Sequence, residues 1–305
     1  MKKLLIIALA STVLLASCNK TPEEVLGALE IQFAGQVLQA AVAGVEPMVQ
    51  NLEWATDDRI GIYMIKADPG TLATEYILVE NRQLAAIGGA TTSFFAIEGG
   101  PMLFPTNPDE SIRFIAYRPF SENITSDFRL PIDLSDQSDL SKLQVLYVPI
   151  TNSFNRTRSG AIPLEFRPQL TKLVLNITNG PGVNIPVENG LEIRISGQPT
   201  QGYLSLIDGT VSSSNIPSEV VIFSTGEGTT VTAEAMVFPG STAGIQFTII
   251  NEIGQEFVVN LPSQTWQNST LYTYSISLTI FPSSSGVPSM MASSSTKTNL
   301  VGVLR

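Results

Sequence analysis

The chain has 305 residues, of which 17 are Lys or Arg and 27 are Asp or Glu, so its formal net charge is −10. This acidity argues against a nucleic acid as partner, because surfaces that bind nucleic acids are basic. The sequence has no histidine and one cysteine. That composition excludes histidine-based acid–base catalysis, Ser-His-Asp triads, Cys-His dyads, His/Cys zinc sites and intrachain disulfides. We therefore expect neither an enzyme nor a cofactor or metal site.

The first residues have the pattern of a bacterial lipoprotein signal. Two lysines precede an apolar run at residues 4–15, and small residues then lead to Cys18. The run is shorter than the roughly 20 residues that a membrane-spanning helix needs. Small residues directly before a cysteine are typical of a cleavage site whose cysteine is acylated. We expect a signal peptide at residues 1–17, lipidation at Cys18 and a polar tether at residues 18–27.

Acylation of Cys18 predicts where the mature protein lies. Two or more acyl chains hold a protein stably on a membrane, at about 0.8 kcal/mol per buried methylene. Two acidic residues, Glu23 and Glu24, follow the cysteine and resemble the export tag of surface-exposed lipoproteins. We therefore expect a protein that is lipid-anchored to the outer membrane and exposed on the cell surface.

The rest of the chain predicts an all-β protein. Residues 271–280 alternate between apolar or aromatic side chains and Ser or Thr. Such period-2 alternation is typical of a strand with one buried and one solvated face. Residues 245–249 and 256–261 alternate in the same way on either side of a turn signal at residues 251–254. This pattern predicts an antiparallel hairpin.

Turn and loop signals divide the chain. Short apolar runs separated by Pro and Gly clusters are typical of β-sandwiches, and a polar, basic stretch at residues 153–160 indicates a boundary. After residue 280 the composition becomes rich in Ser, as in a linker. The expected units are an N-terminal β-sandwich at 28–160, a C-terminal β-sandwich at 161–280, and a tail at 281–305.

Five segments, in chain order, resemble motifs of the fimbrillin family, the subunits of type V pili. They are WATDDRIGIYM at 54–64, MLFP at 102–105 with IRFIAYRPF at 112–120, DQS at 136–138 with VLYV at 145–148, LEFRPQLTKL at 164–173, and STLYTYSISL at 269–278. In this order the segments place the resemblance over roughly residues 29–280.

The resemblance implies two tandem antiparallel Greek-key β-sandwich domains of the transthyretin-like type, in a structural or adhesive subunit of fimbriae. In this family an incomplete sandwich leaves an apolar groove, which an extended strand from a neighbouring subunit fills. The implied partners are other fimbrial subunits, in a homopolymer or heteropolymer, and a glycan or protein on a host or bacterial surface. The strand expected to cover the groove carries Leu29, Ile31 and Phe33. The candidate donor strand carries Leu300, Val301, Val303 and Leu304.

The chain departs from the family pattern in ways that bear on maturation. Asp57 stands in place of a glycine, Arg118 in place of a tyrosine and Pro168 in place of a histidine. In polymerising fimbrillins an Arg-specific protease removes the lipidated first strand. No arginine occurs between Cys18 and Arg59. We therefore expect this subunit to keep its lipid, as an anchor or accessory subunit would.

A second function remains open on the sequence alone, that of a surface glycan-binding lipoprotein. Exposed, coplanar aromatic rings around Trp54 or Trp266 would favour glycan binding. Each tryptophan lies beside an apolar strand, however, so we expect both to pack in the core or at a domain seam.

Two polar groups have a structural and a functional interpretation. Asp133, Asp136 and Asp139 recur every third residue, but they lack the glycine and spacing of a calcium-binding loop, so a solvated loop is expected. Arg156 and Arg158 flank a polar stretch that is either a protease-sensitive site or a solvated loop, and the solvated loop is preferred.

Overall fold

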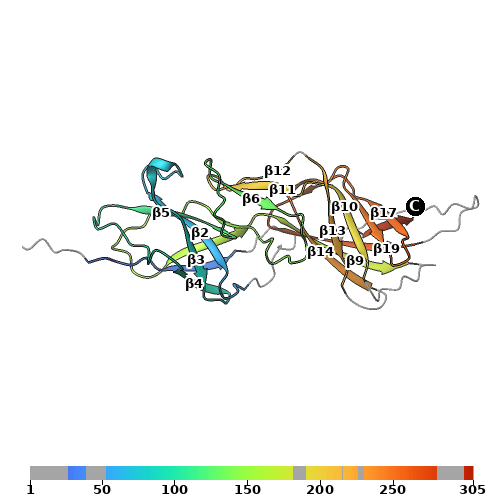
Figure 1. The fold of residues 1–305 in the computed structure, drawn as a ribbon, viewed down its shortest axis with the longest axis horizontal. Coiled ribbons are helices and arrows are strands. Elements are labelled where there is room, and N and C mark those ends of the chain that lie inside the picture. The colour runs from blue at the N-terminus through green and yellow to red at the C-terminus, as the bar shows by residue number, and fades with distance from the viewer. Residues whose placement is uncertain are drawn as a thin grey trace, which may run out of the picture.

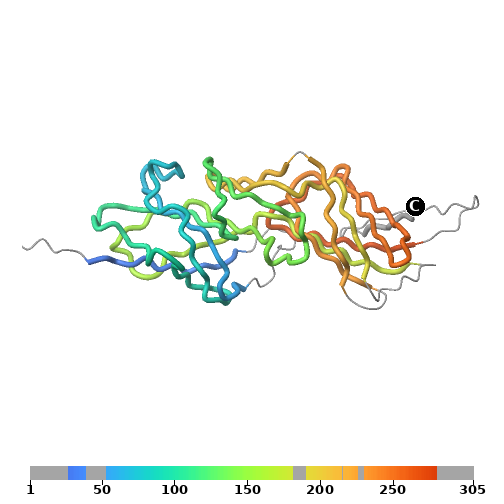
Figure 2. The backbone as a smooth tube through the Cα atoms, in the orientation of Figure 1, coloured from blue at the N-terminus to red at the C-terminus, as the bar shows by residue number. Residues whose placement is uncertain are grey.

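The computed structural model describes residues 27–38, 53–180, 190–214, 216–225, 230–279 and, as backbone, 299–304. The all-β prediction is confirmed: within these ranges there are strands and a single short helical turn, η1 (Thr74–Tyr76). The molecule is elongated, with two β-rich halves placed end to end (Figure 1). The smooth tube in Figure 2 shows the chain crossing between the halves near the middle of the long axis.

The N-terminal half is a closed barrel of seven strands in the order β1-β4-β3-β2-β5-β7-β8. Its aliphatic and aromatic side chains alternate inward and form one buried cluster. The strands are β1 (Phe33–Val37), β2 (Arg59–Lys66), β3 (Ile77–Ala86), β4 (Thr91–Ala96), β5 (Ile112–Arg118), β7 (Leu146–Val148) and β8 (Ile162–Pro168).

The C-terminal half contains an eight-stranded sheet in the order β13-β10-β16-β17-β20-β19-β9-β14. Strands from both ends of this order contribute to one buried cluster, so the sheet folds over on itself as a sandwich. Phe247 and Tyr274, for example, come from the two layers and meet edge to face at 5.7 Å between ring centroids. The strands are β9 (Thr171–Asn179), β10 (Glu192–Gln198), β13 (Ser218–Phe223), β14 (Thr230–Val237), β16 (Gln246–Ile250), β17 (Glu256–Asn260), β19 (Thr270–Leu278) and β20 (Asn299–Leu304).

A three-stranded sheet, β12-β11-β6, joins the two halves. Strand β6 (Arg129–Asp133) follows the barrel strand β5, and it pairs with β11 (Gln201–Ser205), which pairs with β12 (Val211–Ser213). A third buried cluster lies beneath this sheet and contains residues of both halves, such as Tyr117 and Phe238. A two-stranded ribbon pairs β15 (Gly240–Ser241) with β18 (Thr265–Trp266).

The order of the strands refines the expected domain division. Strand β8 closes the barrel against β1 and β7, so the chain leaves the N-terminal half between Pro168 and Thr171 rather than at residue 160. Among the described strands, three pairs are parallel, namely β1·β8, β9·β19 and β19·β20, which an expectation of purely antiparallel domains did not include. The hairpin predicted around residues 251–254 is confirmed by the antiparallel pair β16·β17. The Greek-key, transthyretin-like connectivity stays a prediction.

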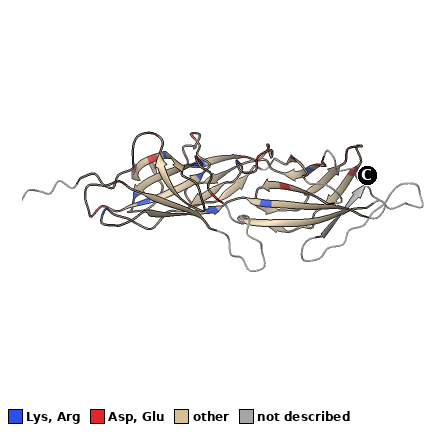
Figure 3. Ribbon diagram, turned by 90° about the horizontal axis from the view of Figure 1, so that it is seen from below, with Lys and Arg blue, Asp and Glu red and all other residues tan. Residues whose placement is uncertain are grey.

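Charged residues are distributed over both halves of the molecule (Figure 3). Among the described residues, no helix is long and apolar enough to cross a membrane.

Candidate functional site

The first described segment, residues 27–38, is bound along nearly its whole length. Strand β1 lies between β4 and β8, antiparallel to β4 and parallel to β8. Before the strand begins, Ile31 N–H donates to the Met102 carbonyl at 2.8 Å, and Phe104 N–H donates to the Leu29 carbonyl at 2.9 Å. The segment therefore closes the barrel and also pairs with the chain that follows β4.

Two of the three predicted groove-covering side chains are buried. Phe33 and Ile31 expose 3% and 5% of their surface, whereas Leu29 exposes 39%. Phe33 meets Phe114 of β5 edge to face, with ring centroids 5.1 Å apart. Removal of β1 would expose this apolar interior and two unpaired strand edges, so a vacated barrel would offer a groove for an extended strand.

Gly35 lets an aromatic ring lie against the middle of β1. A Cβ at this position would run into the ring of Phe94 and would also approach Phe166 of β8. Glycine in a strand often marks such a close approach. The close packing of β1 against Phe94 therefore depends on Gly35 having no side chain.

Arg156 ties the start of the segment to the barrel. Its guanidinium donates to the Gly27 carbonyl at 2.9 Å, to the Thr106 carbonyl at 2.9 Å and to the Pro105 carbonyl at 3.3 Å. The neighbouring Arg158 stacks over Phe154, with its guanidinium carbon 4.8 Å from the ring centroid. The polar stretch with two arginines, expected to be a plain solvated loop, thus holds the entry of the chain into the barrel.

The last described segment, β20, is an interior strand of the C-terminal sheet. It runs antiparallel to β17 and parallel to β19. Leu300 and Leu304 are in register with Ile276 and Phe257, both of which belong to the buried cluster. Val301 and Val303 are in register with Ser277 and Val258. The candidate donor segment therefore lies in its own subunit here, where it joins the two layers of the sandwich.

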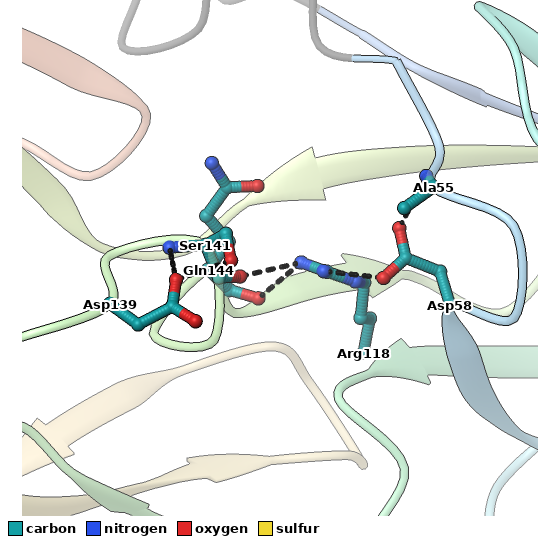
Figure 4. Close-up of polar contacts among 6 residues, drawn as sticks. All are labelled: Ala55, Asp58, Arg118, Asp139, Ser141 and Gln144. Atoms are coloured by element: carbon teal, nitrogen blue, oxygen red, sulfur yellow. Dashed lines mark hydrogen bonds and ion pairs between the residues drawn. The ribbon is translucent and has the colours of Figure 1, made fainter.

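Arg118, the residue that replaces a tyrosine of the family pattern, forms a small polar cluster (Figure 4). Its guanidinium contacts the Asp58 carboxylate at 2.7 Å, and the two side chains expose only 12% and 17% of their surface. It also donates to the carbonyls of Ser141 and Gln144. Asp58 in turn accepts from the backbone N–H of Ala55 at 2.9 Å. The cluster fastens the loop after β6 to the start of β2.

Both tryptophans pack in the interior, as expected. Trp54 exposes 3% of its surface and meets Phe94 and Phe166 edge to face. Trp266 exposes 1% and donates its indole N–H to the Tyr274 hydroxyl at 2.7 Å. The exposed, coplanar rings that would favour glycan binding at these positions are therefore not present.

The three spaced aspartates form local turns. Asp133, Asp136 and Asp139 each accept the backbone N–H of the serine two residues later. Hydrogen bonds from these serines hold the pKa of each carboxyl below its usual value. Within the described ranges, no group of three or more acidic or cysteine side chains could hold a metal ion. Cys18 lies outside the described residues, so its lipidation stays a prediction.

Residues 48–289 match the model of the fimbrillin-like family. The chain belongs to this family. A comparison with curated proteins finds no match.

Solved structures share the fimbrillin-like fold at low sequence identity. A candidate cell adhesion protein from Bacteroides uniformis has a TM-score of 0.65 and 20% identity, and the match covers 90% of this chain and 97% of that one. A second, from Bacteroides ovatus, has a TM-score of 0.61 and 17% identity, with 82% and 92% covered. A third, from Bacteroides fragilis, has a TM-score of 0.50 and 14% identity, with 85% and 95% covered. At these identities the likeness is one of fold.

Proposed function

We propose that this fimbrillin-like chain is a structural or adhesive subunit of cell-surface fimbriae that joins its neighbours by β-strand donation. The observation that carries the proposal is the position of the two terminal described strands. Strand β1 lies between β4 and β8, and β20 lies between β17 and β19. A strand from another subunit that takes an interior position regains hydrogen bonds on both edges. Replacement of the subunit's own strand by a strand from a neighbour therefore conserves most of the backbone hydrogen bonds.

The chain between β19 and β20 is long enough for the tail to reach a neighbour. The two strands are parallel, and β20 begins opposite Ser275, three residues before β19 ends at Leu278. At about 3.3 Å per residue, the connection at residues 279–298 therefore has to bridge only about 10 Å along the strand direction. The connection can extend to about 65 Å. The tail can therefore insert either in its own sheet or in an adjacent subunit.

The proposed position in the fimbria is at the membrane. Without an arginine between Cys18 and Arg59, the family's usual cut has no substrate, and β1 stays in its barrel. A subunit that keeps β1 can donate its tail but cannot accept a strand at the barrel. We infer that it anchors or accompanies the fimbria through lipid on Cys18 in the outer membrane.

Fractionation of cells tests the anchor role. The proposal expects the protein in the outer-membrane fraction, with palmitate label that the Cys18→Ser variant loses. Its mature N-terminus should be residue 18 by mass spectrometry. A mature N-terminus near residue 40 in sheared fimbriae would contradict the anchor role, because the lipid and β1 would then have been removed.

Two variants test strand donation. Deletion of residues 282–305 should leave the protein in the membrane but abolish its recovery with other fimbrial subunits, and unchanged recovery would reject the tail as donor. Gln39→Arg adds the missing cleavage residue just past β1. After treatment with an Arg-specific protease, this variant should become an acceptor and form multimers, whereas the equally treated parent should stay monomeric.

A further inference from the structure

A cavity in the N-terminal half lies apart from both terminal strands. Its volume is about 400 Å³, and its walls include Tyr63, Glu80, Asn81, Glu122, Thr125 and Phe128. These residues come from β2, β3 and the loop that leads into β6. That loop and η1 rise on the same side of the molecule as the joining sheet (Figure 1). Tyr63 and Phe128 of the cavity walls also pack in the buried cluster that contains residues of both halves, so the cavity lies beside their junction.

A β-bulge forms one wall of the cavity. Ile62 pairs with Arg82 and Met64 pairs with Val79, so two residues of β3, Glu80 and Asn81, lie opposite the single residue Tyr63 of β2. Asn81 has a φ of 37° in the left-handed region. Bulges redirect side chains and are over-represented beside functional sites. Here the bulge brings a carboxylate and an amide to the cavity.

The facing loop is held in place by hydrogen bonds. The Asn81 amide donates to the Ser121 carbonyl at 2.9 Å and accepts from the buried Tyr117 hydroxyl at 2.6 Å. Phe128, whose φ is 59°, donates its N–H to the Thr125 carbonyl at 2.9 Å. Phe128 also meets Tyr63 edge to face, with ring centroids 6.1 Å apart. The cavity is therefore formed before any ligand arrives, which lowers the entropic cost of binding.

Asn81 and Thr125 of the cavity have hydrogen-bond partners, but other polar groups of its described walls do not. Tyr63 exposes 1% of its surface, yet its hydroxyl makes no hydrogen bond with any residue that the structure describes. Burial and the charge of Glu80 raise the pKa of Tyr63 to about 12, so the hydroxyl stays protonated at neutral pH. Across the described ranges, neither Glu80 nor Glu122 has an ion pair. None of the described residues that line the cavity is a Lys or Arg.

We propose that this cavity binds a positively charged lysine or arginine side chain of a partner protein. Two carboxylates attract the cation and accept charge-assisted hydrogen bonds. The Tyr63 hydroxyl oxygen supplies a further acceptor, and the half-buried ring of Phe128 offers aromatic contact to a cation. The net charge of −10 favours approach of a basic partner over long range. A neutral sugar would leave two negative charges without a counter-charge.

Titration of the intact mature protein with single-residue probes tests this site. The probes are Nα-acetyl-lysine methylamide and Nα-acetyl-arginine methylamide, and the readout is the ¹⁵N–¹H NMR shifts of Asn81, Thr125 and Phe128. Comparison of the two distinguishes an ammonium from a guanidinium ligand. Nα-acetyl-norleucine methylamide has the apolar stem without the charge, and N-acetylglucosamine represents a neutral sugar. We expect shifts with at least one cationic probe and with neither neutral one.

Variants show whether the cavity is responsible. Glu80→Gln combined with Glu122→Gln should weaken binding of the cationic probe at least tenfold, which corresponds to about 1.4 kcal/mol, because both charge-assisted hydrogen bonds to the cation are lost. Glu110→Gln removes an exposed charge elsewhere in the same half and should leave binding unchanged. Tyr63→Phe should weaken it less than the double variant.

Three outcomes would overturn the site. They are binding of a neutral probe as strong as that of the cations, equal loss with Glu110→Gln, and no shift with any cationic probe although the protein is folded. None of them bears on strand donation, because β1 and β20 do not line the cavity. Failure of this inference and failure of the proposed function are therefore distinguishable.

Discussion

The buried side chain of Gln137 pairs with the backbone of Met236 in both directions. Met236 N–H donates to the Gln137 amide oxygen at 2.8 Å, and the Gln137 amide nitrogen donates to the Met236 carbonyl at 3.1 Å. Gln137 lies in the loop after β6, and Met236 lies in β14, the last strand in the order of the C-terminal sheet. The amide thus completes the edge of that sheet as a further strand would, and it links the two halves of the molecule.

Replacement of Gln137 by Leu should destabilise the protein at this junction. The change leaves a buried N–H and a buried carbonyl of Met236 unpaired, which costs about 1–3 kcal/mol. Urea unfolding followed by tryptophan fluorescence measures the loss, since Trp54 and Trp266 report on separate halves. The matched control is Gln144→Leu, because the Gln144 side-chain amide has no hydrogen bond among the described residues. Equal stability of the two variants would contradict the linking role.

A sequence-based interpretation predicts the strands of this fold better than their partners. The alternation around residues 251–254 predicts β16 and β17, because both strands and their turn are adjacent in the chain. The parallel pairing of β1 with β8 joins residues as distant as Phe33 and Ile162, and no local period encodes such a pair. Its physical cause is closure of the barrel over a shared apolar interior.

The polar contacts are harder still to predict from the sequence. Gln137 lies in a segment that resembles a family motif, and Arg156 lies in a polar stretch, but neither pattern indicates which group the side chain contacts. Both act on backbone carbonyl or N–H groups, which every residue has and which leave no signal in a sequence. The bulge at Glu80 and Asn81 likewise depends on a register shift between strands and not on residue type. The sequence therefore contains no signal for the cavity, which only the structure shows.

Arg118→Met should lower stability by about 1–3 kcal/mol, because it leaves the Asp58 carboxylate in a nearly buried position without its counter-charge. A double-mutant cycle with Asp58→Asn measures the coupling between the two side chains. The cycle should return a favourable interaction energy between the two side chains. This energy should decrease only modestly in 0.5 M salt, because salt screens partly buried pairs weakly. Additivity of the two single changes would show that the ion pair contributes nothing.

Stability should decline at alkaline pH, in part through Tyr274. Burial raises the pKa of Tyr274 to about 12 in the folded protein, from 10.0. Above pH 10 the unfolded chain loses this proton while the folded protein retains it, so stability falls as pH rises from 10 to 12. Unfolding at pH 8, 10 and 11 measures the decline. Tyr274→Phe should make the decline shallower, although it lowers stability at pH 8 by leaving the Trp266 indole N–H unpaired.

Gly35→Ala should weaken the packing and pairing of β1 in the barrel, since the added methyl group displaces the ring of Phe94. Overpacking of this kind costs about 1–3 kcal/mol. Hydrogen exchange should rise in β1 and in the facing residues of β4 more than in the C-terminal sheet. Ala34→Ser changes the adjacent residue of the strand and should leave exchange in β1 nearly unchanged. Uniformly faster exchange across both halves would instead indicate a global effect.

Arg156→Ala should free the entry of the chain into the barrel while the barrel stays folded. The change removes three hydrogen bonds to the carbonyls of Gly27, Pro105 and Thr106. Because these groups lie near the surface, each bond contributes about 0.5–1.5 kcal/mol locally, and the midpoint of global unfolding should change little. Amide exchange at Ile31 and Phe104 should accelerate, since their pairing holds the same segment.

Arg158→Ala is the matched control for that experiment. It removes an equal charge two residues away, but Arg158 packs over Phe154 and has no contact with Gly27. If Arg156 secures the segment between the predicted lipid anchor and β1, only Arg156→Ala should raise exchange at Ile31. Arg156→Ala, and not Arg158→Ala, should also make the N-terminal segment more sensitive to a nonspecific protease. Identical behaviour of the two variants would mean that strand pairing alone keeps β1 in the barrel.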